Sequence, residues 1–313
     1  MTIGVALLVG AFLAAAVGHR VLELACRTNI RPRLLIATWM VTAVSTVLTF
    51  IAGVVLMALP GHGGIAQVFN RVGGCLSALQ HGAVPQTEEW TAAGSGALSI
   101  ALLVRFGIVG VRRARLQRRR RDRYRFLSTL AAAPGPAHAD VLWLQHAHPI
   151  AFSVAGRPGL IAASQGLRDR LPPRALAATL EHERAHLRGH HHMIVDLADI
   201  AAAALPFVPL FRIAPGMIRE LVEMAADDVA GQRFGADAVL QALTILAVTN
   251  APSDGLAMAG TAVVKRISRL RKGRASPARW TSTAYTAVIA AVGVVLPSTI
   301  GVGLLFSLAC SVG

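Results

Sequence analysis

Residues 182–186 read His-Glu-Arg-Ala-His, and residues 223–227 read Glu-Met-Ala-Ala-Asp. Side chains four residues apart lie on one face of a helix, so His182 and His186 can bind one Zn²⁺ while Glu183 reaches the water bound to it. The composition gives roughly a 1% chance that such a pentapeptide arises at random in this chain. Five of the eleven histidines fall within or just after the first motif. Together the two motifs predict a zinc peptidase site.

A catalytic zinc site has three protein ligands and keeps a fourth position for water. We expect His182, His186 and Glu223 to be the three ligands. Glu220 and Asp228 lie close enough in the sequence to compete with Glu223 for the third place. The alternative interpretation is that Glu223 and Asp227 lie on the solvated face of a charged helix.

Glu183 is the expected catalytic residue, because it directly follows a ligand. Zinc lowers the pKa of its bound water toward ~7. Glu183 can take the proton as the water attacks a peptide carbonyl, and can then deliver a proton to the leaving amine. Asp227 lies one helical turn beyond Glu223. We expect it to accept a hydrogen bond from the free ring nitrogen of a ligating histidine, which would fix the orientation of that ring.

The next three histidines, residues 190–192, raise the question of a second metal site. Consecutive residues on a helix point in different directions, which favours surface or interfacial positions for them. The group that would stabilise a tetrahedral oxyanion has no signature in the sequence. Arg219, His146 and His148 are the candidates.

The composition predicts an integral membrane protein. Of the 313 residues, 54% are hydrophobic and 15% are charged, which is too apolar for an ordinary soluble domain. Crossing the hydrocarbon core takes about 20 helical residues, and four segments are candidates: 3–18, 35–59, 94–111 and 284–309. For the first, a cleaved signal peptide is the alternative, but no Lys or Arg precedes the apolar run. The third contains Arg105, which must snorkel or face the interior of the bundle.

Basic residues set the expected topology. The net charge is +15, and basic residues are concentrated in the loop 19–33, in nine arginines within 112–125, and in seven residues within 265–279. The positive-inside rule puts these segments in the cytoplasm and the loop 60–93 outside. We therefore expect a multi-pass protein of the cell membrane, with both termini outside and with the region from Arg112 to about Trp280 in the cytoplasm.

An arginine-rich run is also typical of nucleic-acid binding. Here both arginine-rich clusters adjoin apolar spans, where they anchor the topology and contact anionic headgroups at ~1 kcal/mol per charge. We expect the lipid bilayer to be the partner and expect no direct contact with nucleic acid. Cys26 is expected in the cytoplasm. Cys75 and Cys310 fall on the outer side, where a disulfide can form, but small buried thiols are the favoured interpretation.

Composition divides the chain into four parts: a membrane region 1–111, a basic juxtamembrane segment and linker 112–140, a zinc-peptidase domain 141–280 and a last span 281–313. Short strands are predicted at 141–145, 150–154 and 160–163. The second of these can bind a peptide in extended form if it lies at the edge of the sheet, or it can simply complete a core. Pro172-Pro173 then opens the helix that carries the first metal motif.

The apolar stretch 194–213 is long enough to suggest a fifth span. A single crossing would place His186 and Glu223 on opposite sides of the bilayer, so we exclude it. Pro206 and Pro209 favour a broken, interfacial or re-entrant segment, or a core helix of the peptidase domain.

With these motifs, the chain resembles the BlaR/MecR family of integral-membrane gluzincins and, more distantly, the HtpX and CAAX prenyl-protease group. The pattern HExxH followed by Glu-x-x-small-Asp matches His182, Glu183, His186, Glu223 and Asp227. The segment 264–270 and the number of apolar spans match as well. The resemblance implies a membrane α-helical bundle of about four transmembrane helices with an inserted α+β gluzincin domain.

What the resemblance implies for function is a regulatory zinc metalloendopeptidase that cleaves a cytoplasmic transcriptional repressor of the BlaI/MecI type. Two departures limit this. The chain ends at Gly313, where the antibiotic sensors carry a penicillin-binding domain, and His191 replaces an Asp found in many relatives. An HtpX-like quality-control protease is one alternative. A zinc-stabilised signalling scaffold without turnover is another, although the retained Glu183 counts against it.

Overall fold

The computed structural model describes residues 2–26, 30–58, 87–130, 132–133, 141–156, 158–249 and 257–272. The predicted span 284–309, most of the loop 60–93 and the outer cysteines Cys75 and Cys310 lie outside these residues. The predicted linker 131–140 lies mostly outside them.

Two apolar helices near the N-terminus, α1 (Thr2–Cys26) and α2 (Pro32–Ala58), pack against each other. The segments Leu7–Cys26 and Pro32–Val54 are long and apolar enough to cross a membrane, which is typical of membrane association. The first helix was predicted to end at residue 18, which was wrong. It continues to Cys26, because the residues after Gly18 include good helix formers such as Leu22, Glu23 and Leu24.

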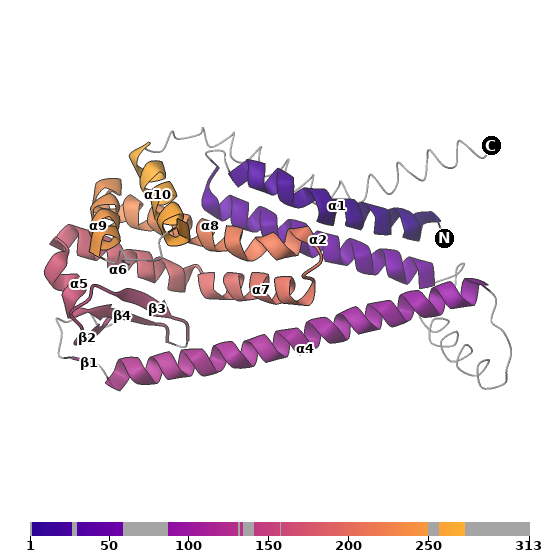
Figure 1. The fold of residues 1–313 in the computed structure, drawn as a ribbon, viewed down its shortest axis with the longest axis horizontal. Helices are drawn as coiled ribbons and strands as arrows, with labels where there is room; N and C mark the ends of the chain where they lie inside the picture. The colour runs from indigo at the N-terminus through magenta and orange to yellow at the C-terminus, as the bar shows by residue number, and fades with distance from the viewer. Residues whose placement is uncertain are drawn as a thin grey trace.

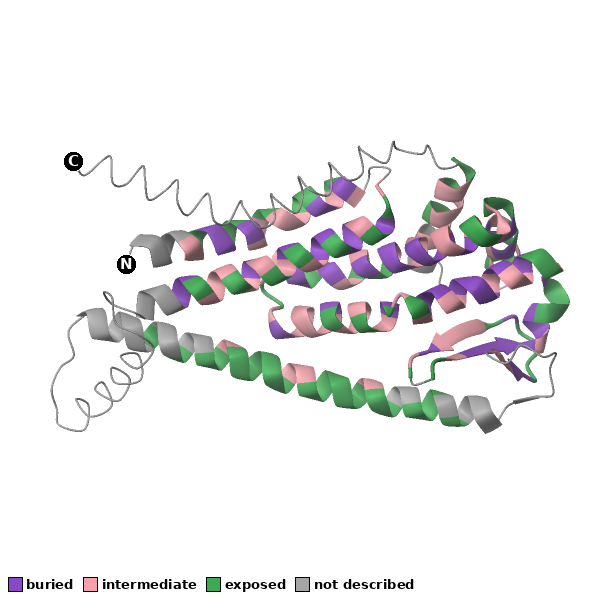
Figure 2. Cartoon of the chain, turned by 180° about the vertical axis from the view of Figure 1, so that it is seen from behind, coloured by how far each residue is buried: buried purple, intermediate pink, exposed green. Residues whose placement is uncertain are grey.

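Helix α4 (Thr87–Leu130) runs the length of the molecule without a break (Figure 1). The boundary expected at 111/112 therefore falls inside one helix. Arginine is a good helix former, and no proline occurs between residues 87 and 130. Arg105 is exposed, and its Nε donates a hydrogen bond to the carbonyl oxygen of Ala204, at the end of the neighbouring helix, over 2.7 Å. The described part of α4 is also mostly exposed (Figure 2).

The predicted strands are confirmed as β2 (Val141–Leu144), β3 (Ala151–Val154) and β4 (Leu160–Ser164). The short strand β1 (Ala132–Ala133) falls inside the predicted linker and pairs with β2. The sheet order is β1-β2-β4-β3, with β4 parallel to β2 and antiparallel to β3. β3 is therefore an edge strand. Alternation along the strands turns Trp143, Ile161 and Ala163 toward the helical side, where they form a core with Leu167 and Leu180.

Helix α5 (Gln165–Arg170) follows the sheet, and four longer helices come after it: α6 (Pro173–Arg188), α7 (His191–Ala204), α8 (Pro209–Phe234) and α9 (Ala236–Thr249). The described chain ends with α10 (Ala257–Arg271). Pro173 opens α6, as predicted. The break in the apolar stretch is also confirmed, because α7 ends at Ala204 and Pro209 starts α8 in the reverse direction (Figure 1).

The α7–α8 hairpin packs against α1 and α2 rather than against the sheet. Its core includes Leu22 of α1, Trp39 of α2, Ala198 of α7, and Leu210 and Ile218 of α8. The described chain thus has two main cores, one between the apolar helices and the hairpin and one between the sheet and α6. Helices α6 and α8 connect the two cores, and they carry the two sequence motifs.

Small buried residues allow α6 and α8 to approach closely. Ala178 and Ala185 of α6 and Ala225, Ala226 and Ala230 of α8 are at most 2% exposed. Alanine leaves no side chain beyond Cβ to hold the backbones apart and has the highest helix propensity. The consequence is that long polar side chains projecting from the two helices reach one another beside this contact.

Candidate metal centre

The first motif lies in the last two turns of α6. His182 and His186 are 9% and 8% exposed, and their Nε2 atoms are 3.1 Å apart. The ring centroids are separated by 4.8 Å at an interplanar angle of 69°. Two imidazoles that direct the same kind of nitrogen at one point are arranged to share a metal ion.

The second motif brings Glu223 of α8 to the same point. Its Oε2 lies 3.4 Å from Nε2 of His182, and its Oε1 lies 3.3 Å from Nε2 of His186. One ligand atom from each of the three residues falls within a span of 4.8 Å. The competing carboxylates are engaged elsewhere, since Glu220 pairs with Lys265 and Asp228 pairs with Arg269. The structure thus brings together the three residues predicted as ligands.

Asp227 lies behind the histidines, as expected of a residue that orients a ligand. Its Oδ1 is 3.0 Å from Nδ1 of His182, and the residue is 1% exposed. This burial excludes the alternative that Asp227 belongs to a solvated helix face. A hydrogen bond at Nδ1 leaves Nε2 of His182 free to bind a metal ion.

Arg266 of α10 is a residue of this site that the sequence analysis missed. Its Nε and Nη2 donate to the two carboxylate oxygens of Asp227, each over 2.7 Å. Its Nη1 lies 3.0 Å from Oε2 of Glu223. The basic cluster that contains it was interpreted as a topology signal. The available signal was spacing, because Lys265, Arg266 and Arg269 share one helix face, as do the acidic residues of α8.

The position of His191 differs from the one predicted from the sequence. This residue was expected at a surface or an interface, but it is 4% exposed, and its Nδ1 lies 3.0 Å from Nδ1 of His186. The reason is that α6 ends at Arg188 and α7 begins at His191, with His190 between them in a left-handed conformation at φ 50°, so residues 190–192 do not continue α6. His190 itself is exposed, as expected. His191 thereby supplies a polar partner to the second histidine ligand.

Glu183 projects from α6 toward the edge strand. Burial raises the pKa of its carboxyl group, against the lowering effects of the His182 charge and of a hydrogen bond with Ser153 of β3. The Oγ of Ser153 also lies 3.3 Å from Nε2 of His192. A raised carboxyl pKa brings a general base closer to neutral pH, where it exchanges protons most effectively.

The electrostatics of the two histidine ligands differ. Burial lowers the pKa of His182, but hydrogen bonds with Asp227 and Glu223 outweigh it and raise that pKa to about 9. For His186, burial prevails over the attraction of Glu223 and lowers the pKa to about 3. Burial raises the pKa of both carboxyl groups, but the His182 and Arg266 interactions outweigh it and hold the pKa of Glu223 and that of Asp227 at about 2.

The candidates for an oxyanion-stabilising group lie elsewhere. Arg219 binds both carboxylate oxygens of Asp199 over 2.7 and 2.8 Å. His146 and His148 are turned toward each other, with 3.2 Å between Nδ1 of His146 and the backbone nitrogen of His148. We therefore assign none of the three to the metal centre.

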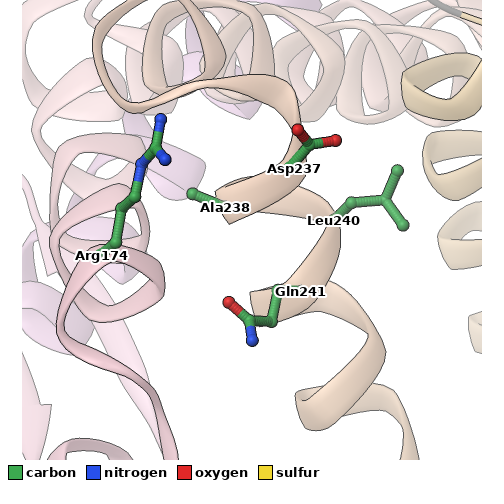
Figure 3. A pocket seen from close by; sticks show the side chains of 5 residues that line it. All are labelled: Arg174, Asp237, Ala238, Leu240 and Gln241. Carbon is green, nitrogen blue, oxygen red and sulfur yellow. The ribbon is translucent and has the colours of Figure 1, made fainter.

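A hollow of about 420 Å³ lies between α6 and α9, at the far end of α6 from the histidines (Figure 3). Arg174, Asp237, Ala238, Leu240 and Gln241 line it. Arg174 is engaged there, since its Nε donates to the carbonyl oxygen of Phe234 over 2.8 Å. This hollow is separate from the metal centre.

No protein-family model matches the chain, and no solved structure matches it. The resemblance of its motifs to the BlaR/MecR family therefore stays a prediction. The donor set itself, two imidazoles and one carboxylate, suits a catalytic zinc ion and leaves a fourth position for water. Other divalent first-row metals accept the same donors.

Proposed function

We propose that this chain is a membrane-embedded zinc metalloendopeptidase with a cytoplasmic active site. The observation that supports it best is the convergence of His182, His186 and Glu223 from two helices, with Glu183 on the same helix as the histidines. A structural metal site has no open coordination position and needs no carboxylate such as that of Glu183 beside it. The proposal assigns ligation to the first three residues and general-base catalysis to Glu183.

The chain's own residues account for the steps that a protease needs. When bound, the metal ion would lower the pKa of a coordinated water and polarise the scissile carbonyl. Glu183 takes a proton from the attacking water and returns a proton to the leaving amine. Asp227 and His191 hold the rings of His182 and His186 so that their Nε2 atoms face the metal.

Strand β3 offers the substrate a place beside the metal centre. It is hydrogen-bonded on one side to β4, and its Ser153 contacts His192 in the first turn of α7. Phe152 points to the opposite face, where its ring meets Tyr124 of α4 at a centroid distance of 6.3 Å. Among the described strands none pairs with the other side of β3, and an extended peptide can form backbone hydrogen bonds there, which places its carbonyl groups next to α6.

We further propose four membrane-spanning helices, with both termini outside and the peptidase domain in the cytoplasm. The two N-terminal helices that are long enough to cross support this, together with the basic residues that follow each proposed inward crossing. The resemblance of the motifs points to a cytoplasmic repressor as the substrate. A membrane bundle that rearranges on a signal would then control access to the cleft.

The test uses purified full-length protein in lipid vesicles and two variants. Wild type should cleave an unfolded polypeptide such as casein, and Glu183→Gln should lower the rate by at least about 100-fold while retaining zinc. Glu181→Gln is unsuitable as a control, because Glu181 is buried and ion-paired to three arginines. Exposed Asp169→Asn is a better one and should leave the rate unchanged. Equal rates for wild type and Glu183→Gln would contradict the proposal.

A further inference from the structure

If α4 crosses the membrane as proposed, its contacts with α7 show how far the metal centre lies from the hydrocarbon core. The two helices lie side by side and make contact at two points. Nε of Arg105 donates to the carbonyl oxygen of Ala204, and Gly110 faces Ile200, whose Cγ2 would lie 3.9 Å from a Cβ at residue 110. Five residues along α4 toward the cytoplasm, from Arg105 to Gly110, correspond to four residues along α7, from Ala204 to Ile200. The two helices are therefore antiparallel, and position along one can be converted into position along the other at about 1.5 Å per residue.

This register sets the distance of the metal centre from the hydrocarbon core. Ala204 and His191 are the two ends of α7, about 20 Å apart. His191 is therefore level with residues 119–120 of α4. The apolar half of α4 ends where the arginine run starts at Arg112, which marks the expected edge of the hydrocarbon. The metal centre lies about 10 Å beyond that edge, at the outer margin of the lipid headgroups.

Helix α2 gives a second indication of where the metal centre lies relative to the membrane. Its apolar segment Pro32–Val54 starts at the basic end of the loop between α1 and α2. Leu35, near the start of α2, belongs to the same core as Ile194 in the first turn of α7. The cytoplasmic end of this candidate span therefore lies close to the start of α7 and to the metal centre.

The α7–α8 hairpin extends from this level toward the hydrocarbon core. Arg219 of α8 and Asp199, past the middle of α7, join the two helices of the hairpin by an ion pair. The tip of the hairpin, residues 205–208, lies about 10 Å deeper than this ion pair. It carries Phe207, which is 69% exposed. Arg212 is exposed on the hairpin and has a side chain long enough to snorkel outward.

A re-entrant segment must satisfy its backbone groups without water. The carbonyl groups at the end of α7 have no helical partner, and in hydrocarbon each such group costs several kcal/mol. Arg105 meets this need, because its guanidinium group contacts the carbonyl oxygens of both Ala203 and Ala204. The charge at that depth, which would be costly on an isolated helix, has a partner in the hairpin.

We propose that the α7–α8 hairpin is re-entrant and holds the metal centre at the membrane surface, so that the substrate is a polypeptide segment held at that surface. This deepens the proposed function and rests on it. A segment tethered to the bilayer meets the site at a high effective concentration, whereas a free polypeptide does not. A soluble repressor would then be cleaved when it is brought to the membrane.

Spin labels on full-length protein in phosphatidylcholine–phosphatidylglycerol vesicles test the depth. With the three native cysteines replaced by serine, single cysteines are placed at Phe207, at Met193 beside the metal centre, and at Val248 of α9 as an exposed control. We expect the Phe207→Cys label to be relaxed by oxygen rather than by a water-soluble nickel chelate. The Val248→Cys label should show the reverse, and Met193→Cys should lie between them. A Phe207→Cys label as accessible to the chelate as Val248→Cys would overturn the re-entrant hairpin.

Cleavage tests the substrate class. Fluorescent casein is offered either free or coupled to a lipid in the same vesicles, at the same total concentration. We expect cleavage of the coupled form to be at least about tenfold faster, and to be lost in Glu183→Gln. Equal rates would overturn a membrane-held substrate. Absence of cleavage in both arms would contradict the protease assignment itself, while the spin-label profile would still decide where the metal centre lies.

Discussion

Helices α4 and α10 both carry clustered basic residues next to a proposed membrane boundary, yet they use them differently. On α10, Lys265, Arg266 and Arg269 form ion pairs with carboxylates of α8 at 2.7–3.0 Å. On α4, the described arginines between residues 112 and 125 are exposed. The difference lies in the opposing helix, because α8 presents acidic residues at matching intervals. Similar local composition therefore supports a candidate metal site in one place and an expected headgroup contact in the other.

The comparison predicts its largest effect at Arg266. Arg266→Ala would leave the buried carboxylate of Asp227 without its bidentate partner, and loss of one member of a buried pair costs about 3–5 kcal/mol. We expect the zinc affinity to fall about 10–100-fold, because the ring of His182 loses its fixed support. Competition with a chelating dye measures this affinity. The matched control on α4, Arg113→Ala, should leave it unchanged, and an equal loss in both variants would refute the distinction.

The pH dependence of zinc binding tests the pairing of His182 with Asp227. With a pKa of about 9, His182 is protonated at neutral pH in the metal-free protein, whereas His186, with a pKa of about 3, is not. Zinc must therefore displace one proton, so its apparent affinity should rise about tenfold per pH unit from pH 6 and level off near pH 9. Asp227→Asn lowers the pKa of His182 and should move the plateau to lower pH. A flat profile for the wild type between pH 6 and 8 would contradict this assignment.

A smaller effect is expected at Arg105 of α4. Arg105→Leu makes the apolar half of α4 more hydrophobic, which by hydropathy alone should favour a membrane span. We expect the opposite result for the folded protein, because the carbonyl groups at the end of α7 lose a charged donor worth about 1.5–3 kcal/mol. The melting temperature in nanodiscs should fall by roughly 5 °C. Arg113→Leu, which changes an exposed arginine of the same helix, should not lower it, and similar melting temperatures for both variants would exclude the capping contact.

Sequence periodicity and turn residues predict the helices and strands of this fold better than they predict the contacts between them. The strands, the proline start of α6 and the break before Pro209 follow from periodicity and turn residues, and the structure confirms them. The placement of Glu223 beside two histidines was expected from motif spacing. Arg266 was missed because its partner Asp227 is 39 residues away, and only the packing of α10 on α8 creates that contact.

His191 was misplaced for a related reason. Its expected position assumed one continuous helix through residues 190–192, but the left-handed conformation of His190 starts a new helix and turns His191 inward. The continuity of α4 was also missed, because the change from apolar to basic residues at 111/112 was taken as a domain boundary. A change in side-chain chemistry does not by itself interrupt a helix, since arginine has a high helix propensity and no proline breaks the segment.

The central claim is that His182, His186 and Glu223 hold a zinc ion, and its most direct test is the metal content of matched variants. Elemental analysis of purified protein should find about one zinc per chain in the wild type and in Glu220→Ala, whose carboxylate pairs with Lys265 outside the site. Glu223→Ala should lose most of the zinc under the same dialysis, while keeping the wild-type helical content by circular dichroism. Full retention of zinc in Glu223→Ala, or an equal loss in Glu220→Ala, would contradict the account.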